Sequence, residues 1–313
     1  MVQTICKQLA VPLICAAAAG GGAPPAGAQP GPKASPAKSA LTVGISDNSA
    51  AMFSESQYQS LHSTTARDMV FWNIAVMKNK KYLKATRQWV NAAVADGVNP
   101  MISFAGNGNY IPSVSVYTKA IRAFIKMFPQ VKTYTPWNEP DWIYRPALAK
   151  HPSLAAGYFN ALAKYCHRCT VAAGDVYLPS NQGLASWVRA YARSLHHRPA
   201  AWALHPYDDI RAHQTKQIQA FESVTRGPIW LTEISGVERR GHWGFKNQNQ
   251  NHANKDERFL FALPKRFHRI TRIYHYQWQG TPSAPWDSGL LGPQGRPRPA
   301  YYTVRSATQG HLP

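Results

Sequence analysis

Short, nearly continuous apolar runs recur along the chain from residue 41 onward, and each is followed by a polar or amphipathic stretch. Eight such runs are centred near Val43, Val70, Ile102, Tyr134, Ala173, Ala203, Leu231 and His275. Strands that are buried on both faces have this pattern, because neither face alternates with water. We therefore expect eight strands of a parallel sheet.

Between these runs, apolar residues recur at intervals of three and four, which is typical of helices that bury one face. The helical stretches are 82–94, which Gly97 is placed to end, 116–128, 154–165, 183–195 and 256–267, in which Pro264 should kink or end the helix. Strands that alternate with helices predict an α/β fold with a parallel sheet. With eight repeats and no glycine-rich phosphate loop, we expect a single (β/α)8 TIM barrel over residues 41–313 rather than a doubly wound sheet.

The first 40 residues differ from the rest. Residues 1–28 combine a lysine, the short apolar stretch LAVPLICAAAA and small residues at 26–28, which is the pattern of a signal peptide. Cys15 would fit a lipoprotein signal, but Ile14 is a poor residue before a lipidated cysteine. Residues 29–40 are rich in Pro, Ala, Lys and Ser and predict a flexible spacer. We expect a protein secreted to the bacterial cell exterior or envelope, with no membrane segment once the signal is removed.

The composition excludes global disorder and indicates a basic protein. Hydrophobic residues make up 44% of the chain, charged residues 16%, and the formal net charge is +20. Removing residues 1–28 would remove one lysine and no acid, which leaves +19. Nucleic-acid binding fits poorly with export, and no nucleic-acid motif is present, so we expect no nucleic-acid partner. Two interpretations of the positive charge remain: attraction to anionic cell-wall polymers, or a basic surface that is merely solvated.

Two carboxylates stand where an apolar run gives way to a loop. Glu139 lies in TYTPWNEPD and Glu233 in GPIWLTEISG, 94 residues apart. A barrel of about 250 residues uses roughly 31 residues per repeat, so the two positions are about three repeats apart at the same mouth. Taken alone, the Asn-Glu-Pro sequence around Glu139 is compatible with a solvated turn. Taken alone, Glu233 is compatible with a buried charge that pairs with an arginine. Together they predict the acid/base and nucleophile pair of a retaining glycosidase.

These motifs resemble clan A of the glycoside hydrolases, which contains cellulases, mannanases, β-xylosidases and β-1,3-glucanases. WNEP follows the fourth expected strand, TEISG the seventh, and Trp278 the eighth in HYQWQG. The resemblance covers residues 41 to about 308 and includes a DSGLL…RPAYY ending. It implies a TIM barrel that hydrolyses β-linked polysaccharides or oligosaccharides with retention, without indicating which sugar.

The resemblance also implies individual roles. Glu139 resembles the acid/base, Glu233 the nucleophile, Asn138 the residue that holds the sugar 2-hydroxyl, and Trp278 the platform below the bound ring. Arg67 matches an arginine that many members place beside the nucleophile, although it could also be a structural ion-pair partner.

Further candidates surround these positions. His205 and Tyr207, in the HPY after the sixth strand, resemble a His/Tyr pair of the clan, while a satisfied core histidine is the alternative for His205. Asn107, after the third strand, could meet sugar hydroxyls. Trp137 could stack on a pyranose face or pack in the core, as could other tryptophans: Trp72, Trp142, Trp243 and Trp286.

Cys166 and Cys169 form CHRC, for which a local disulfide in an exported protein is favoured over a redox pair or a zinc site. No HExxH, GxSxG or phosphate-loop motif occurs, so we expect no metal and no cofactor. We expect a monomer. A sugar-binding barrel without catalysis and a transglycosylase remain alternative functions, although a binding module has no need of both glutamates.

Overall fold

The computed structural model describes residues 41–106, 110–142, 146–240, 249–281 and 285–313. The predicted signal peptide and spacer lie outside these residues and stay predictions. The region from Ser39 to Pro313 forms one compact unit. No helix in the described segments combines the length and the apolar character that a membrane crossing requires.

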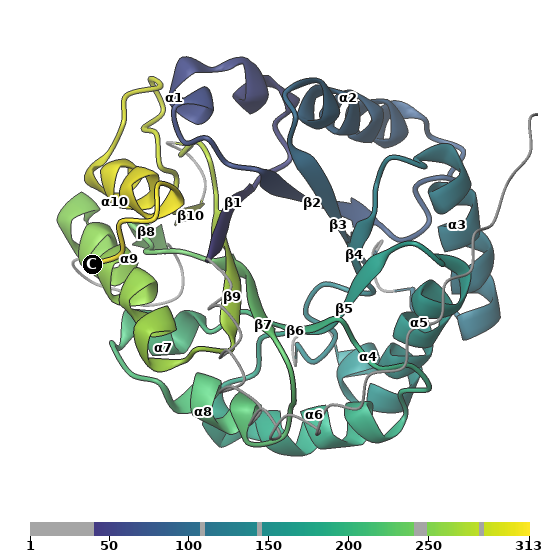
Figure 1. The fold of residues 1–313 in the computed structure, drawn as a ribbon. Coiled ribbons are helices and arrows are strands. Elements are labelled where there is room, and N and C mark those ends of the chain that lie inside the picture. Colours follow the sequence, from purple (N-terminus) through teal and green to yellow (C-terminus); the bar gives the residue numbers. More distant parts are fainter. Residues whose placement is uncertain (1–40, 107–109, 143–145, 241–248, 282–284) are drawn as a thin grey trace, which may run out of the picture. The chain divides into compact units, whose positions relative to one another are not determined.

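Eight parallel strands close into a barrel in the order β1-β2-β3-β4-β5-β6-β7-β9, so the (β/α)8 prediction is confirmed (Figure 1). Each strand falls on one of the eight apolar runs. The strands are β1 (Thr42–Ser46), β2 (Thr65–Phe71), β3 (Asn99–Ala105), β4 (Thr133–Thr135), β5 (Thr170–Val176), β6 (Ala201–Leu204), β7 (Ile229–Ile234) and β9 (Ile270–Tyr276). A two-residue pair, β8 (Arg239–Arg240) and β10 (Trp286–Asp287), forms a separate antiparallel ribbon.

Helices surround the barrel (Figure 1). They are η1 (Ala50–Ser54), α1 (Ser56–Gln59), α2 (Lys81–Ala95), α3 (Val114–Met127), α4 (Pro146–Ala149), α5 (Pro152–Tyr165), η2 (Ser180–Gln182), α6 (Leu184–Arg193), α7 (Tyr207–Arg211), α8 (Lys216–Glu222), α9 (Gln250–Arg266) and α10 (Pro299–Thr308). Pro264 lies inside α9, and the helix continues to Arg266. This is tolerated because the proline falls in the last turn, where few further backbone bonds depend on it.

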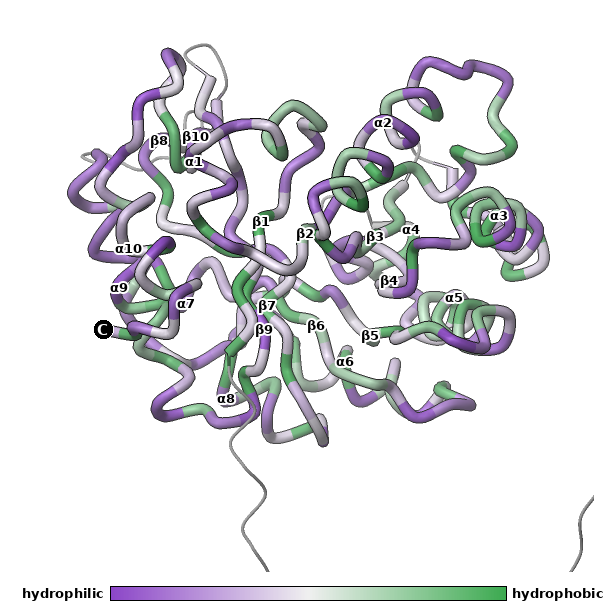
Figure 2. Tube along the Cα trace, turned by 45° about the horizontal axis from the view of Figure 1, so that its top comes forward, coloured by the Kyte–Doolittle hydropathy of each residue, from purple (hydrophilic) through white to green (hydrophobic). Residues whose placement is uncertain are grey.

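Most of the periodic apolar residues are buried, although Tyr82 and Val94, at the two ends of the pattern in α2, are exposed. In α2, for example, Leu83, Trp89, Val90 and Ala93 are buried, whereas Lys84 and its polar neighbours are exposed. Figure 2 shows hydrophobic residues along the strands and recurring on the helices, with hydrophilic residues on the outer turns. The helices are therefore held by burial of one apolar side, which predicted them from sequence.

The interior of the barrel divides into an apolar end and a polar end. A separate apolar cluster includes Met101, Ala203, Trp230 and Tyr274, and the Arg272 guanidinium lies 4.2 Å from the Trp230 ring centre. At the carboxyl ends of the strands, buried interior residues are polar instead. These include Ser46, Arg67, Ser103, Thr135, Asp175 and Thr232.

A disulfide joins Cys166 to Cys169, just before β5, as the local-disulfide interpretation of the CHRC sequence anticipated.

Gly44 gives a test of packing in this barrel. A Cβ at Gly44 would lie 2.6 Å from the Thr65 carbonyl oxygen and 2.8 Å from a Tyr274 ring carbon. Gly44→Ala should therefore lower the free energy of unfolding by about 1–3 kcal/mol, measured by urea denaturation. Gly292→Ala is the control, because its Cβ would meet nothing closer than 3.7 Å; equal losses for the two variants would contradict the packing account.

Candidate active site

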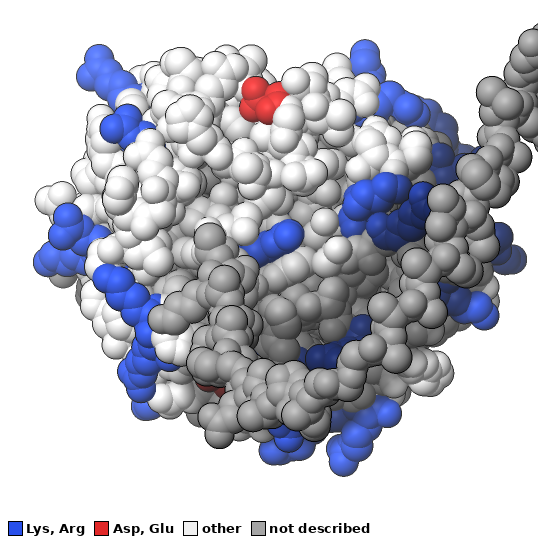
Figure 3. All heavy atoms as spheres, in the orientation of Figure 1, with Lys and Arg blue, Asp and Glu red and all other residues white. Residues whose placement is uncertain are grey.

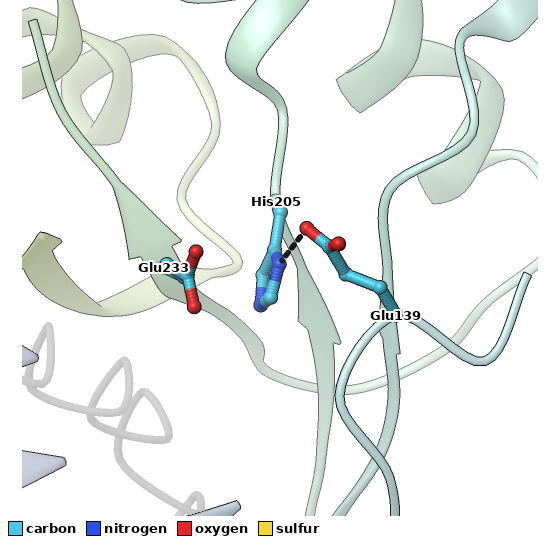
Figure 4. A group of neighbouring side chains, drawn as sticks. All are labelled: Glu139, His205 and Glu233. Atoms are coloured by element: carbon cyan, nitrogen blue, oxygen red, sulfur yellow. Dashed lines mark hydrogen bonds and ion pairs between the residues drawn. The ribbon is translucent and has the colours of Figure 1, made fainter. Parts of the chain in front are cut away.

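Glu139 and Glu233 meet at the carboxyl ends of the strands, as their spacing predicted. Glu233 lies within β7, and Glu139 follows β4 by four residues. One carboxylate oxygen of each, together with a ring nitrogen of His205, lies within 4.8 Å of the others. Figure 4 shows the His205 ring between the two carboxylates.

The backbone around Glu139 is held by neighbouring strands. The Asn138 amide donates to the Phe104 carbonyl at 2.6 Å, and the Glu139 amide donates to the Asp175 carbonyl at 2.9 Å. Glu139 has a φ of 48°, a left-handed conformation that side-chain-bearing residues adopt at a cost of about 1–3 kcal/mol. These two hydrogen bonds hold the conformation that turns the carboxylate towards Glu233.

Arg67 binds the nucleophile candidate from inside the barrel. It is fully buried, and its Nη1 donates to Glu233 Oε2 at 2.8 Å. Its Nη2 donates to Asn138 Oδ1 at 2.5 Å and to Asp175 Oδ2 at 3.2 Å. The remaining donors reach the hydroxyls of Ser103 and Ser46, each at 2.8 Å. Arg67 therefore lies beside Glu233 and is also a structural ion-pair partner, so the two interpretations of this residue hold together.

His205 joins the acid/base candidate to a third carboxylate. Its Nδ1 lies 3.1 Å from Glu139 Oε1, and its Nε2 lies 3.2 Å from Asp175 Oδ1. Burial lowers the pKa of His205, but the charge of Asp175 and its hydrogen bonds to Asp175 and Glu139 outweigh burial and raise the pKa to about 10. We infer an imidazolium that donates to a carboxylate on each side.

Asp175 is the residue that sequence reasoning missed. It is fully buried in β5, and its carboxylate accepts hydrogen bonds from five side chains. The donors are Arg67, His205, Ser103, Thr135 and Thr232. Although burial raises its pKa, Arg67 and His205 lower it well below the usual range. The only sequence signal was an aspartate, Asp175, near the end of an otherwise apolar strand, where an unpaired charge would be costly.

Tyrosines line the side of the site next to Glu233. Tyr207 donates to Glu233 Oε1 at 3.3 Å. Burial first, and then the charge of Glu233, raises the pKa of Tyr207, which keeps its hydroxyl protonated as a donor. Tyr276 ends β9, and burial first, then the charge of Glu233, raises its pKa. Its ring lies near Trp286, which packs edge-on against Tyr207 at 5.1 Å. Tyr276 was not anticipated from sequence.

Two of the predicted sugar-contacting tryptophans belong to the core instead. Trp278 has no exposed surface; its Nε1 donates to Glu55 Oε2 at 2.9 Å, and its ring packs against Tyr58 and Tyr301. A side chain without exposed surface offers no face to a sugar, so the prediction of a platform at Trp278 is wrong for this structure. Trp137 is also buried and stacks on Tyr158 at 5.3 Å. Asn107 lies outside the described residues.

A buried polar network ties the loops after β4, β5 and β6 together. Asp141, two residues after Glu139, accepts from the amides of Tyr177 and Leu178. Gln217 donates to the carbonyls of the same two residues. It also accepts from the Asp209 amide at 3.1 Å, two residues after Tyr207. The segments that carry Glu139 and Tyr207 are thus fixed relative to each other.

Glu139, His205 and Glu233 are the one group in the described part of the chain whose ligand atoms converge closely enough for a metal ion. The donor set suits a proton better than a metal. An imidazole that binds a metal must offer a free nitrogen lone pair, whereas both nitrogens of His205 already lie against carboxylates that favour its protonated form.

Asp175→Asn should lower the free energy of unfolding at neutral pH by about 3–5 kcal/mol, because Arg67 and His205 would each lose one of their two carboxylate partners while their charges stay buried. The substitution should also change how the free energy of unfolding depends on pH above neutrality. The folded-state pKa of His205, about 10, exceeds its ordinary value of 6.5. Its contribution is therefore complete below pH 6.5 and is lost as the pH rises towards 10. Wild-type stability should fall over this window, and the fall should be smaller in Asp175→Asn.

The measurement is urea denaturation from pH 6 to 10. Asp287→Asn is the matched control, since it removes another buried carboxylate, paired with Arg298 at 2.7 Å, that does not contact His205. The control should lose stability but keep the wild-type dependence on alkaline pH. If the free energy of unfolding of Asp175→Asn fell between pH 6.5 and 10 as much as that of the wild type, the assignment of Asp175 as the partner of His205 would be contradicted.

Comparison with known proteins agrees with the geometry. Solved structures of glycoside hydrolases share the fold, and three of them serve as examples. A family 39 glycoside hydrolase from Bacteroides cellulosilyticus has 18% identity over 87% of this chain, with a TM-score of 0.63. GH5_18 from Streptomyces cattleya has 12% identity over 86%, with a TM-score of 0.62. Xylanase 10B from Thermotoga maritima has 11% identity over 87%, with a TM-score of 0.62.

This chain spans 64% of the Bacteroides chain, 80% of the Streptomyces chain and 96% of the Thermotoga chain. No curated protein sequence matches it. The family described as glycosyl hydrolase catalytic core matches residues 100–299, which include both glutamates. The resemblance to the clan A glycosidases is thereby confirmed, and the chain belongs to the glycosyl hydrolase catalytic core family.

Proposed function

We propose that this protein is a retaining glycoside hydrolase that cleaves β-linked polysaccharides or oligosaccharides by double displacement. The observation that carries the proposal is the approach of Glu139 and Glu233, since one carboxylate oxygen of Glu139 lies within 4.8 Å of one carboxylate oxygen of Glu233. Retaining enzymes place their two carboxyl groups about 5–5.5 Å apart, whereas inverting enzymes need roughly 6.5–9.5 Å to admit a water. The observed approach favours direct attack by a carboxylate.

The contacts of Glu233 suit a nucleophile. Arg67 and Tyr207 donate to different oxygens of its carboxylate, at 2.8 and 3.3 Å. Both donors stabilise the ionised form, which is the form that attacks. In the proposed first step, a Glu233 oxygen bonds to the anomeric carbon while the bond from that carbon to the leaving oxygen breaks.

The contacts of Glu139 suit an acid that later becomes a base. His205 lies against Oε1, so we assign the transferable proton to Oε2. Glu139 gives this proton to the leaving oxygen in the first step. It then takes a proton from the water that attacks the anomeric carbon and releases Glu233.

Asn138 is the residue that we propose contacts the sugar directly. Arg67 holds its Oδ1, so its amide nitrogen is the group we expect to donate to a sugar hydroxyl next to the anomeric centre.

We further propose that residues 1–28 act as a signal peptide for export and that the protein acts outside the cell as a monomer. The N-terminal pattern supports export.

Glu233→Gln should lower kcat by at least about 10³-fold on every substrate, because an amide cannot form the glycosyl-enzyme bond. The fold should be retained. The measurement is product release from a panel of β-glucans, mannans and xylans, with sizing of the products. Glu222→Gln, on α8 away from the site, is the control and should turn over normally.

The panel also tests the alternatives. Normal turnover by Glu233→Gln would refute the nucleophile assignment. Binding without turnover by the wild type on every polymer would favour a sugar-binding barrel, and products larger than the substrate would favour a transglycosylase.

The first product released from a β-linked substrate should be the β-anomer. Two successive inversions at the anomeric carbon give net retention. Proton NMR of the early product, recorded before mutarotation, distinguishes the anomers. An α-anomer that appears first would contradict double displacement.

A further inference from the structure

Acidic residues are absent from the outer surface of one continuous part of the barrel. Residues 97–207 contain three acids, Glu139, Asp141 and Asp175, and all three belong to the site or to the network beside it. The described, exposed basic residues of the same span are Lys119, Arg122, Lys126, Lys132, Lys150, Lys164, Arg168, Arg189, Arg193 and Arg198. We call this set the basic flank.

The basic flank occupies neighbouring helices. α3 packs against α5, and α5 packs against α6, so the three form consecutive parts of the outer ring (Figure 1). α2, next in the ring, adds further exposed positive charge at Lys80, Lys81, Lys84 and Arg87. On the face in Figure 3, blue atoms lie along the edge that carries α2 and α3 and also along the opposite edge, and red atoms are scarce.

The charges of the flank lack the compensation that helices usually provide. Lys119, Arg122 and Lys126 follow each other at three and four residues on α3, and Arg189 and Arg193 are four residues apart on α6. Like charges at this spacing destabilise a helix, whereas an acid at the same spacing would stabilise it. Residues 208–313 contain eight acids and fifteen basic residues. Four of these acids are buried and Glu233 lies in the site, so the difference from the flank is limited to three partly exposed acids, Asp208, Glu222 and Glu238.

We propose that the basic flank binds an anionic polysaccharide that carries carboxylate groups. A polyanion would neutralise several of these charges at once, and the flank is large and unbroken by negative charge. The choice of a polysaccharide rests on the proposed function, because binding here would hold the hydrolase on the matrix that contains its substrate. The flank side chains lie outside the catalytic machinery, so docking and hydrolysis are separable.

The experiment compares two variants of the whole chain that remove the same charge. The flank variant carries Lys119→Gln, Lys126→Gln, Arg189→Gln and Arg193→Gln. The control carries Lys216→Gln, Arg226→Gln, Lys255→Gln and Arg258→Gln, which are equally exposed. Binding to polygalacturonate is measured by affinity electrophoresis at low salt, with a neutral glucan and double-stranded DNA as the other probes.

We expect the flank variant to bind polygalacturonate roughly tenfold more weakly than the wild type, and the control to stay within about twofold. Binding should weaken as salt rises past about 0.1 M, where screening acts over about 10 Å. Equal losses in both variants would show that net charge, not the flank, is responsible, and would overturn the proposal. Failure of the wild type to bind polygalacturonate would also overturn it, as would flank-dependent binding that is tighter for DNA.

Turnover is measured in parallel on a soluble neutral substrate, which both variants should hydrolyse like the wild type. A wild type that hydrolyses nothing yet binds polygalacturonate through the flank would refute the proposed function alone. A wild type that hydrolyses normally without binding polygalacturonate would refute the flank alone.

Discussion

The site depends on one carboxylate, that of Asp175, which is linked to the carboxylates of both glutamates through other side chains. Asp175 holds Arg67 with one oxygen and His205 with the other. Arg67 in turn binds Glu233, and His205 binds Glu139. With His205 protonated, three carboxylates face two cations, so the cluster has one negative charge that a further proton would neutralise.

The barrel and the meeting of Glu139 and Glu233 could be predicted from sequence because both leave local signals. Eight apolar runs and the intervening helical periodicity follow directly from burial, and Glu139 and Glu233 stand at the ends of such runs. Asp175 gave no comparable signal. Its role depends on donors from four other strands and from His205 after β6, and which side chains point inward together is set by the register of the whole barrel.

Asp175 was missed, whereas Trp278 was wrongly predicted to contact the sugar. Sequence placed it correctly after the last strand, but it could not tell which way the side chain turns. The backbone amide of Trp278 donates to Asp47 and its ring nitrogen to Glu55, so the ring enters the layer between barrel and helices. Tyr276, two residues earlier and still within β9, occupies the site side instead. Which of two aromatic residues near a strand end faces the site is decided by such contacts and not by residue type.

The side chains of the network that holds Glu139 and Glu233 come largely from inside the strands: Arg67 in β2, Ser103 in β3, Thr135 in β4, Asp175 in β5 and Thr232 in β7. Their spacing is inherited from hydrogen-bonded strand pairing, which changes little when a connecting loop grows or shrinks. Descendants of this barrel could therefore lengthen or replace the loops after β3 and β7, and so acquire new sugar preferences, while the distance between the two glutamates stays the same.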